Sequence, residues 1–168
     1  MSIKTLVGQL YQTQIRVVRR VGLATDVATQ PTTTNLFTVS GGDVLVLAMY
    51  GKVMATKQVA AQTIAVQHTP TAGVAAAIAA ASATTSGDAI NSIYSITGVP
   101  GDALIVAQVA TALGVGQNGN ALGTIRSDLV LVAGIISMLT GGATDNSGLV
   151  DWVISYVPLA PASLITVL

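Results

Sequence analysis

Apolar residues along the chain form short runs that alternate with polar positions or are broken by turn residues. The clearest run is LVDWVISYVPL at residues 149–159. Successive side chains of a β-strand point to opposite faces, so one face of this run carries Val150, Trp152, Ile154 and Tyr156 and is strongly apolar. Burying a tryptophan removes roughly 150 to 250 Å² from water. We therefore expect Trp152, Ile154 and Tyr156 to form the centre of the core, with the other strands packed against them.

The same pattern predicts further strands within residues 36–168. Residues 44–56 begin with the run VLVLAMY, which is apolar on both faces and is typical of a central strand covered on both sides. Turns rich in glycine and aspartate separate the shorter segments. These other predicted strands span residues 36–40, 63–69, 92–97, 129–133, 135–140 and 164–168. Short strands at this spacing predict an all-β fold, an antiparallel β-sandwich.

Two segments fit a helix or a strand. Residues 74–83, VAAAIAAASA, have the highest helix propensity in the chain. Their flanking residues offer neither a helix cap nor a charged face, and a row of alanines also suits a strand that lies close beneath a neighbouring sheet. We favour a strand there, and residues 103–113 leave the same two alternatives open.

The composition changes this picture, because charged residues are too few to cover the surface of a soluble monomer. They make up 8% of the 168 residues, where roughly 25% is usual, and hydrophobic residues make up 51%. No run approaches the roughly 20 apolar residues of a membrane-spanning helix, and the N-terminus does not read as a signal peptide. We expect a protein made in the cytoplasm, without a membrane partner, whose surface is largely buried against other protein chains.

Charge is unevenly distributed although the net charge is zero. Residues 1–21 hold four cations and no acid, whereas residues 22–168 hold three cations and seven aspartates. We interpret residues 1–35 as an extended basic arm with its linker and residues 36–168 as the β-sandwich body. Three arginines without interleaved aromatic residues are a weak nucleic-acid signal, so we expect the arm to bind an acidic protein surface and no nucleic acid. The arm cations assigned to this contact are Lys4, Arg16, Arg19 and Arg20.

One glycine motif and one histidine are candidates for a binding or catalytic role. Gly114, Gly116 and Gly119 match the spacing of a phosphate-binding loop, but no acidic residue follows at about 20 residues and no βαβ unit surrounds them, so we interpret them as a surface loop. His68 is the only histidine, and no nucleophile or acid stands at a paired spacing. We interpret His68 as a residue of a strand end or an interface, with a weak pH-sensing role as the alternative.

Most aspartates lie beside glycine or serine, where their side chains favour turns. These are Asp43, Asp88, Asp102, Asp128 and Asp145. The run DNSG at residues 145–148 has oxygen ligands but lacks the spacing and the final bidentate glutamate of an EF-hand calcium loop. The chain has no cysteine, which excludes disulfides and thiolate metal sites. The sequence therefore predicts no catalytic residue, cofactor or metal site.

Three stretches of the body carry a resemblance. They are GGDVLVLAMYGKV at 41–53, AINSIYSITGVPGDAL at 89–104 and GLVDWVISYVPLAPASLITVL at 148–168. Together they resemble the head decoration, or cement, proteins of tailed bacteriophages. The resemblance implies a β-sandwich body with jelly-roll-like connectivity, a homotrimer, the major capsid protein as partner, and a location on the outer capsid surface of the virion. It implies adhesion across capsomer joints rather than enzymatic activity.

Two other functions compete with this interpretation. A phage tail or head-fibre component that binds the host surface would carry exposed aromatic residues on its loops. A small hydrolase would need a convergent polar site, which one histidine without any glutamate or cysteine does not supply. If the arm only attaches the body to a shell, removing residues 1–30 leaves a folded body and weakens that attachment.

Overall fold

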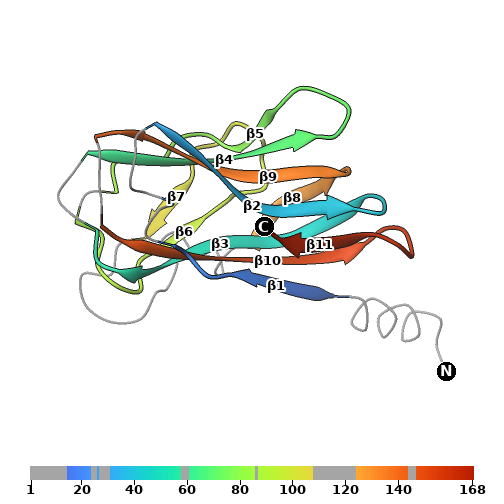
Figure 1. The fold of residues 1–168 in the computed structure, drawn as a ribbon, viewed down its shortest axis with the longest axis horizontal. Helices are drawn as coiled ribbons and strands as arrows, with labels where there is room; N and C mark the ends of the chain where they lie inside the picture. Colours follow the sequence, from blue (N-terminus) through green and yellow to red (C-terminus); the bar gives the residue numbers. More distant parts are fainter. Residues whose placement is uncertain are drawn as a thin grey trace.

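The computed structural model describes residues 15–23, 26, 31–57, 61–85, 87–107, 124–143 and 147–168. These residues form two antiparallel β-sheets stacked as layers, with no α-helix in the described part (Figure 1). The strands are β1 (Arg16–Arg20), β2 (Thr32–Ser40), β3 (Val44–Ala55), β4 (Gln62–Pro70), β5 (Ala76–Ala79), β6 (Ile93–Ser95), β7 (Ile105–Ala107), β8 (Thr124–Leu131), β9 (Gly134–Gly142), β10 (Leu149–Pro158) and β11 (Leu164–Val167). The prediction of an all-β antiparallel sandwich is confirmed, and its jelly-roll connectivity stays a prediction.

We call the two layers sheet I and sheet II. Sheet I has the order β1-β10-β3-β6-β7, and β8 pairs with the first half of β3 beside β6. Sheet II has the order β11-β2-β9-β4-β5. Most connections cross from one sheet to the other, so that β2 and β3, or β9 and β10, are consecutive in the chain but lie in different layers. This crossing places both chain-terminal strands, β1 and β11, on the same side of the sandwich (Figure 1).

The strands predicted from the pattern of residues 36–168 are all present, with ends shifted by a few residues. The alanine-rich segment is also a strand, since β5 pairs with β4 and buries Ile78 and Ala79. Tertiary pairing overrides its intrinsic helix propensity. Of the second ambiguous segment, residues 105–107 form β7, and residues 108–113 lie outside the described residues.

The core lies between the sheets and is centred on β10 as predicted. Trp152, Ile154 and Tyr156 are completely buried. Gly51 of β3 lies directly opposite Trp152, and a Cβ atom at Gly51 would approach the indole ring to 3.1 Å, so the glycine leaves room for the ring. The Tyr156 hydroxyl accepts a hydrogen bond of 3.0 Å from the backbone N–H of Ile165 in β11, which ties sheet I to sheet II.

The two sides of the sandwich differ. On one side, Ala80 next to β5 forms a parallel bridge with Ala103 next to β7, with N–H to oxygen distances of 2.8 Å from Ala80 to Asp102 and 3.0 Å from Leu104 to Ala80. Backbone hydrogen bonds thus join the sheets there. On the opposite side, β1 and β11 are the outermost strands of their sheets, and no further described strand pairs with either. We call this open side the β1–β11 seam.

The prediction that residues 1–35 form an arm separate from the body is wrong for the described part of that range. Residues 16–20 are β1, which pairs with β10 in a continuous register from Arg16–Tyr156 to Arg20–Trp152. β2 begins at Thr32, ahead of the predicted boundary. β1 joins the body because of the side chains on its inward face. Val18 packs against the core, and Arg20 forms an ion pair with Asp26. Removing residues 1–30 would strip β1 from sheet I, so this deletion is expected to destabilise the body and not only to weaken attachment.

Candidate interaction surface at the β1 edge

β1 presents an alternating surface because its odd-numbered residues point away from the core. Val17 and Val21 expose 63% and 62% of their surface, and Ile15 is also exposed. Val18 lies on the inward face and packs against the core. Exposed apolar residues continue on β11 across the seam at Leu164, Val167 and Leu168. Exposed apolar residues thus occur on or next to the outermost strands of both sheets.

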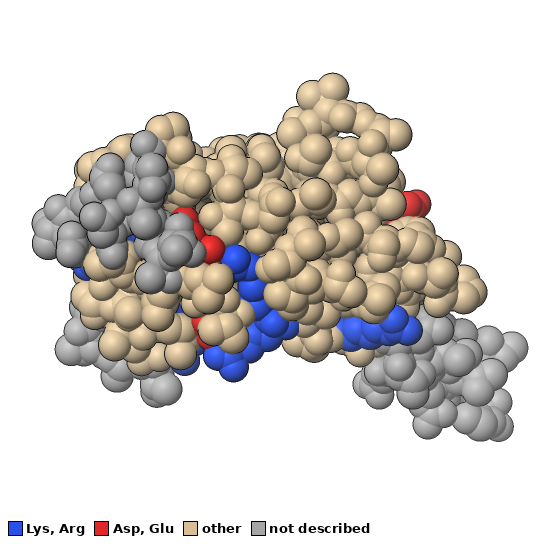
Figure 2. All heavy atoms as spheres, viewed as in Figure 1, with Lys and Arg blue, Asp and Glu red and all other residues tan. Residues whose placement is uncertain are grey.

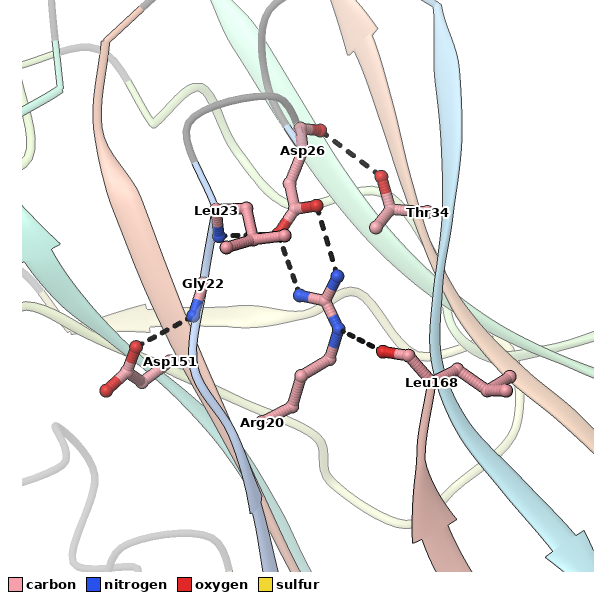
Figure 3. Close-up of polar contacts among 7 residues, drawn as sticks. All are labelled: Arg20, Gly22, Leu23, Asp26, Thr34, Asp151 and Leu168. Carbon is pink, nitrogen blue, oxygen red and sulfur yellow. Dashed lines mark hydrogen bonds and ion pairs between the residues drawn. The ribbon is translucent and has the colours of Figure 1, made fainter.

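Arg20 fastens β1 to the body through a buried polar cluster (Figure 3). Its side chain is 6% exposed and donates two hydrogen bonds, of 2.7 and 3.1 Å, to the two carboxylate oxygens of Asp26. Its Nε donates to the backbone oxygen of Leu168 at 3.2 Å. Asp26 in turn accepts the backbone N–H of Leu23 at 2.9 Å, and its own backbone oxygen accepts the hydroxyl of Thr34 at 3.3 Å. We call this set the Arg20 cluster, and it joins β1, β2 and the end of β11.

Arg19 points the other way and forms a second ion pair, with Asp151 of β10. Its side chain remains 58% exposed, whereas the Asp151 side chain is buried and also accepts the backbone N–H of Gly22 at 2.9 Å. Burial by itself would raise the pKa of Asp151, but the hydrogen bonds from Arg19 and Gly22, with the charges of Arg19 and Lys52, outweigh burial and lower its pKa. Asp151 is thus an ionised anchor beneath a partly exposed arginine.

A hollow of about 240 Å³ lies beside this pair on the outer face of sheet I. It is lined by Arg19, Tyr50, Lys52, Met54, Asp151 and Val153. Within the described part of the chain, neither the Lys52 side chain nor the Arg16 side chain has a hydrogen-bond or ion-pair partner. Figure 2 shows lysine and arginine atoms gathered over the side of the molecule where β1 runs. On this face Asp26 and Asp151 are buried and already paired with Arg20 and Arg19, so the side chains of Arg16 and Lys52 are the cations left for a partner.

The predicted partner-binding cations therefore separate into three kinds. Arg16 and Arg19 lie at the surface of β1, as a contact with a partner requires. The prediction for Arg20 is wrong, because this buried side chain is used inside the chain. Lys4 lies outside the described residues. Sequence reasoning missed Asp26 and Asp151, and the one available signal was an acid at position 151 within an otherwise apolar strand.

The candidate chemical residues do not converge. Asp43 and Asp102 adjoin turns as predicted, whereas Asp128 lies within β8 and the turn prediction for it is wrong. Asp88 is buried and accepts the Tyr94 hydroxyl at 2.7 Å, a structural contact. The glycine motif at 114, 116 and 119 and Asp145 lie outside the described residues. Among the residues that the structure describes, no group of three or more potential metal ligands occurs.

His68 is buried on β4, with 6% exposure, and its Nε2 has no hydrogen-bond partner in the described part of the chain. Burial lowers the pKa of His68 below its ordinary value of 6.5, against a smaller opposing effect of a hydrogen bond with the backbone of Val132. In the unfolded chain, His68 therefore binds a proton near its ordinary pKa. In the folded chain, His68 binds this proton only at lower pH. Protonation of His68 in the unfolded chain thus lowers the stability of the fold as the solution is acidified below the ordinary pKa.

We expect the free energy of unfolding to fall as pH decreases from about 6.5, with a limiting slope of about 1.4 kcal/mol per pH unit for one proton. Urea denaturation at a series of pH values measures this slope. His68→Gln keeps a neutral polar side chain and should flatten the curve between the ordinary and the lowered pKa. Equal slopes for the two proteins would show that another group carries the pH dependence.

Comparison of the chain with known proteins identifies no relative. No protein-family model, curated protein or solved structure matches the chain. In the described residues, no helix has the length and hydropathy needed to cross a bilayer.

Proposed function

We propose that this chain is a virion structural protein that binds the outside of a phage capsid and stabilises the joints between capsomers, as a decoration or cement protein. The observation that carries the proposal is the β1–β11 seam, where exposed valines and leucines lie beside Arg16 and Arg19 on an open side of the sandwich. Exposed apolar surface of this kind marks a protein contact, and a chain with 8% charged residues has little else to keep it apart from partners.

The mechanism is adhesion. A protein that binds the assembled shell but not its separated subunits stabilises the assembly by its binding free energy. Standard protein interfaces bury about 1,600 Å² in total, so contacts must extend beyond one strand to neighbouring surfaces. A homotrimer, which the resemblance implies, would supply three copies of the seam to one junction. No bond is made or broken in this function, and the major capsid protein is the partner.

The alternative of a tail or head fibre that binds host glycans has less support. Aromatic side chains are the usual platform for sugars, and those of Phe37, Tyr94, Trp152 and Tyr156 are all buried in the core. Tyr50, on the outer face of sheet I, is half-buried. Within the described residues, no loop presents an aromatic side chain to solvent.

Co-sedimentation with purified phage shells tests the proposal. We expect the wild-type chain to sediment with the shells, and the double variant Val17→Ser with Val21→Ser to bind at least about tenfold more weakly because it loses two exposed apolar contacts of the seam. Val132→Ser is the matched control, since Val132 is similarly apolar and exposed but follows β8. Light scattering of the unassembled protein supplies the mass and is expected to give a trimer.

Two results would count against the proposal. Wild-type protein that stays in the supernatant at all concentrations would remove the capsid as the partner. Equal loss of binding in Val132→Ser and in the seam variant would show that the contact is not made through β1.

A further inference from the structure

Besides its side chains, the β1 surface has a backbone feature, which is the outer edge of the strand. β1 pairs with β10 on one side, and no described strand pairs with the other. In an antiparallel pair, alternate N–H and C=O groups of an edge strand point outward and can pair with another strand. β1 contains no proline, and its register with β10 has no bulge. The two backbone features that usually block an edge are thus missing from β1, and among the described residues charged side chains are what guards it.

Those charges decide which strand can be added. Arg16 and Arg19 both reach solvent from β1, and Lys52 lies in the neighbouring hollow. A second copy of this chain would bring the same cations to the same edge, with no unpaired carboxylate between them among the described residues. Like charges across a strand pair are destabilising, whereas opposite charges stabilise it. The edge therefore favours an acidic strand.

The aliphatic side chains beside the cations determine which other residues the added strand needs. Val17 and Val21 alternate with Arg19 on the outward face, so an added strand meets an aliphatic residue and a cation in turn. Strand addition of this type takes affinity from main-chain hydrogen bonds and specificity from alternate side chains. We propose that the free edge of β1 accepts, as an added strand, an extended segment of the shell protein whose every second residue is in turn aliphatic and acidic, so that both kinds lie on the face that meets Val17, Arg19 and Val21. This inference rests on the proposed attachment to a capsid.

Three synthetic peptides of about seven residues, the length of an ordinary strand, test it with the full chain. The first carries valine and aspartate in turn at every second position with threonine between them, the second has lysine in place of each aspartate, and the third is the acidic peptide with proline in place of its central residue. Fluorescence anisotropy of the labelled peptides measures binding at low and high salt. We expect the acidic peptide to bind at least about tenfold more tightly than the other two, because lysine reverses the charge match and proline removes a backbone donor.

A variant of β1 supplies the matched control. Arg16→Glu reverses the charge of an exposed cation that has no side-chain partner among the described residues, and it leaves the Arg19–Asp151 ion pair intact. We expect this variant to weaken the preference for the acidic peptide and to keep its denaturation midpoint close to that of the wild type. Equal binding of the acidic and proline peptides, or no binding of any peptide, would overturn strand addition.

Pairing of a second copy of this chain with the same edge would also overturn the inference. Disulfide cross-linking detects such pairing. The chain has no cysteine, so Val17→Cys introduces a single thiol at the edge. A disulfide-linked homodimer of this variant after oxidation, together with no discrimination among the peptides, would assign the edge to self-pairing. Shell binding by the wild type would in either case still support the proposed function, so the failure of the two ideas can be distinguished.

Discussion

Replacing Arg20 with alanine is expected to lower the free energy of unfolding by about 3–5 kcal/mol, the usual cost of removing one partner of a buried ion pair. The variant leaves the carboxylate of Asp26, whose residue is 8% exposed, without its two hydrogen bonds from the guanidinium. It also removes the donor to the backbone oxygen of Leu168. Guanidinium chloride denaturation, with the slope held as a check on two-state behaviour, measures the change.

Two comparisons make this result specific to the Arg20 cluster. Arg16→Ala removes an exposed cation from the same strand and should change stability by no more than about 0.5 kcal/mol. Arg20→Met combined with Asp26→Leu removes both charges and should recover much of the loss, because no buried charge is left unpaired. If Arg20→Ala were as mild as Arg16→Ala, the cluster would not be what holds β1 to the body.

Trp152→Ala is expected to cost about 3–5 kcal/mol, the range for removing a large aromatic side chain from a packed core. The ring is completely buried between the sheets and lies over Gly51. Trp152→Phe should cost clearly less, because it keeps an aromatic ring and removes an indole N–H that has no hydrogen-bond partner among the described residues. Thermal and chemical denaturation of both variants measure the difference.

Val153→Ala is the control for Trp152, since Val153 is the next residue of β10 and points to the outer face. Its loss should cost less than about 1 kcal/mol, because a half-exposed side chain has less buried surface to lose. A Trp152→Phe variant as unstable as Trp152→Ala would indicate that the shape of the indole, rather than its apolar area, is what the core requires.

The two layers and most strands could be predicted because they follow from the alternation of apolar and polar residues over short stretches of sequence. Alternation from Val150 to Tyr156 is visible in the sequence and places the same side chains in the core of the structure. Glycines at positive φ, such as Gly41 and Gly42, end strands where the sequence already marks a turn. The alanine-rich segment was ambiguous because alanine suits both helix and strand, and only its pairing with β4 decides between them.

The candidate site was less predictable, because pairings between distant residues decide it. Arg19 and Arg20 are adjacent in the sequence and were assigned the same role, yet one reaches solvent and the other is buried against Asp26. Lys57 is another example: lysine side chains are rarely buried, yet this one is buried and donates to Gln62. Where a cation finds its counter-charge depends on the tertiary fold, so composition and spacing could identify the basic segment but not which arginine faces a partner.

The pairing of β1 with β10 also sets the order of events during synthesis. Arg19 and Asp151 are 132 positions apart, so β1 leaves the ribosome long before the strand that it needs. Contacts so distant in sequence form late and slow the folding of β-proteins. A nascent chain cannot display the outer edge of β1 in its final form until β10 has been made and has joined sheet I. If the chain attaches through this edge as proposed, only completed subunits attach, and an interrupted translation product does not compete for the same place.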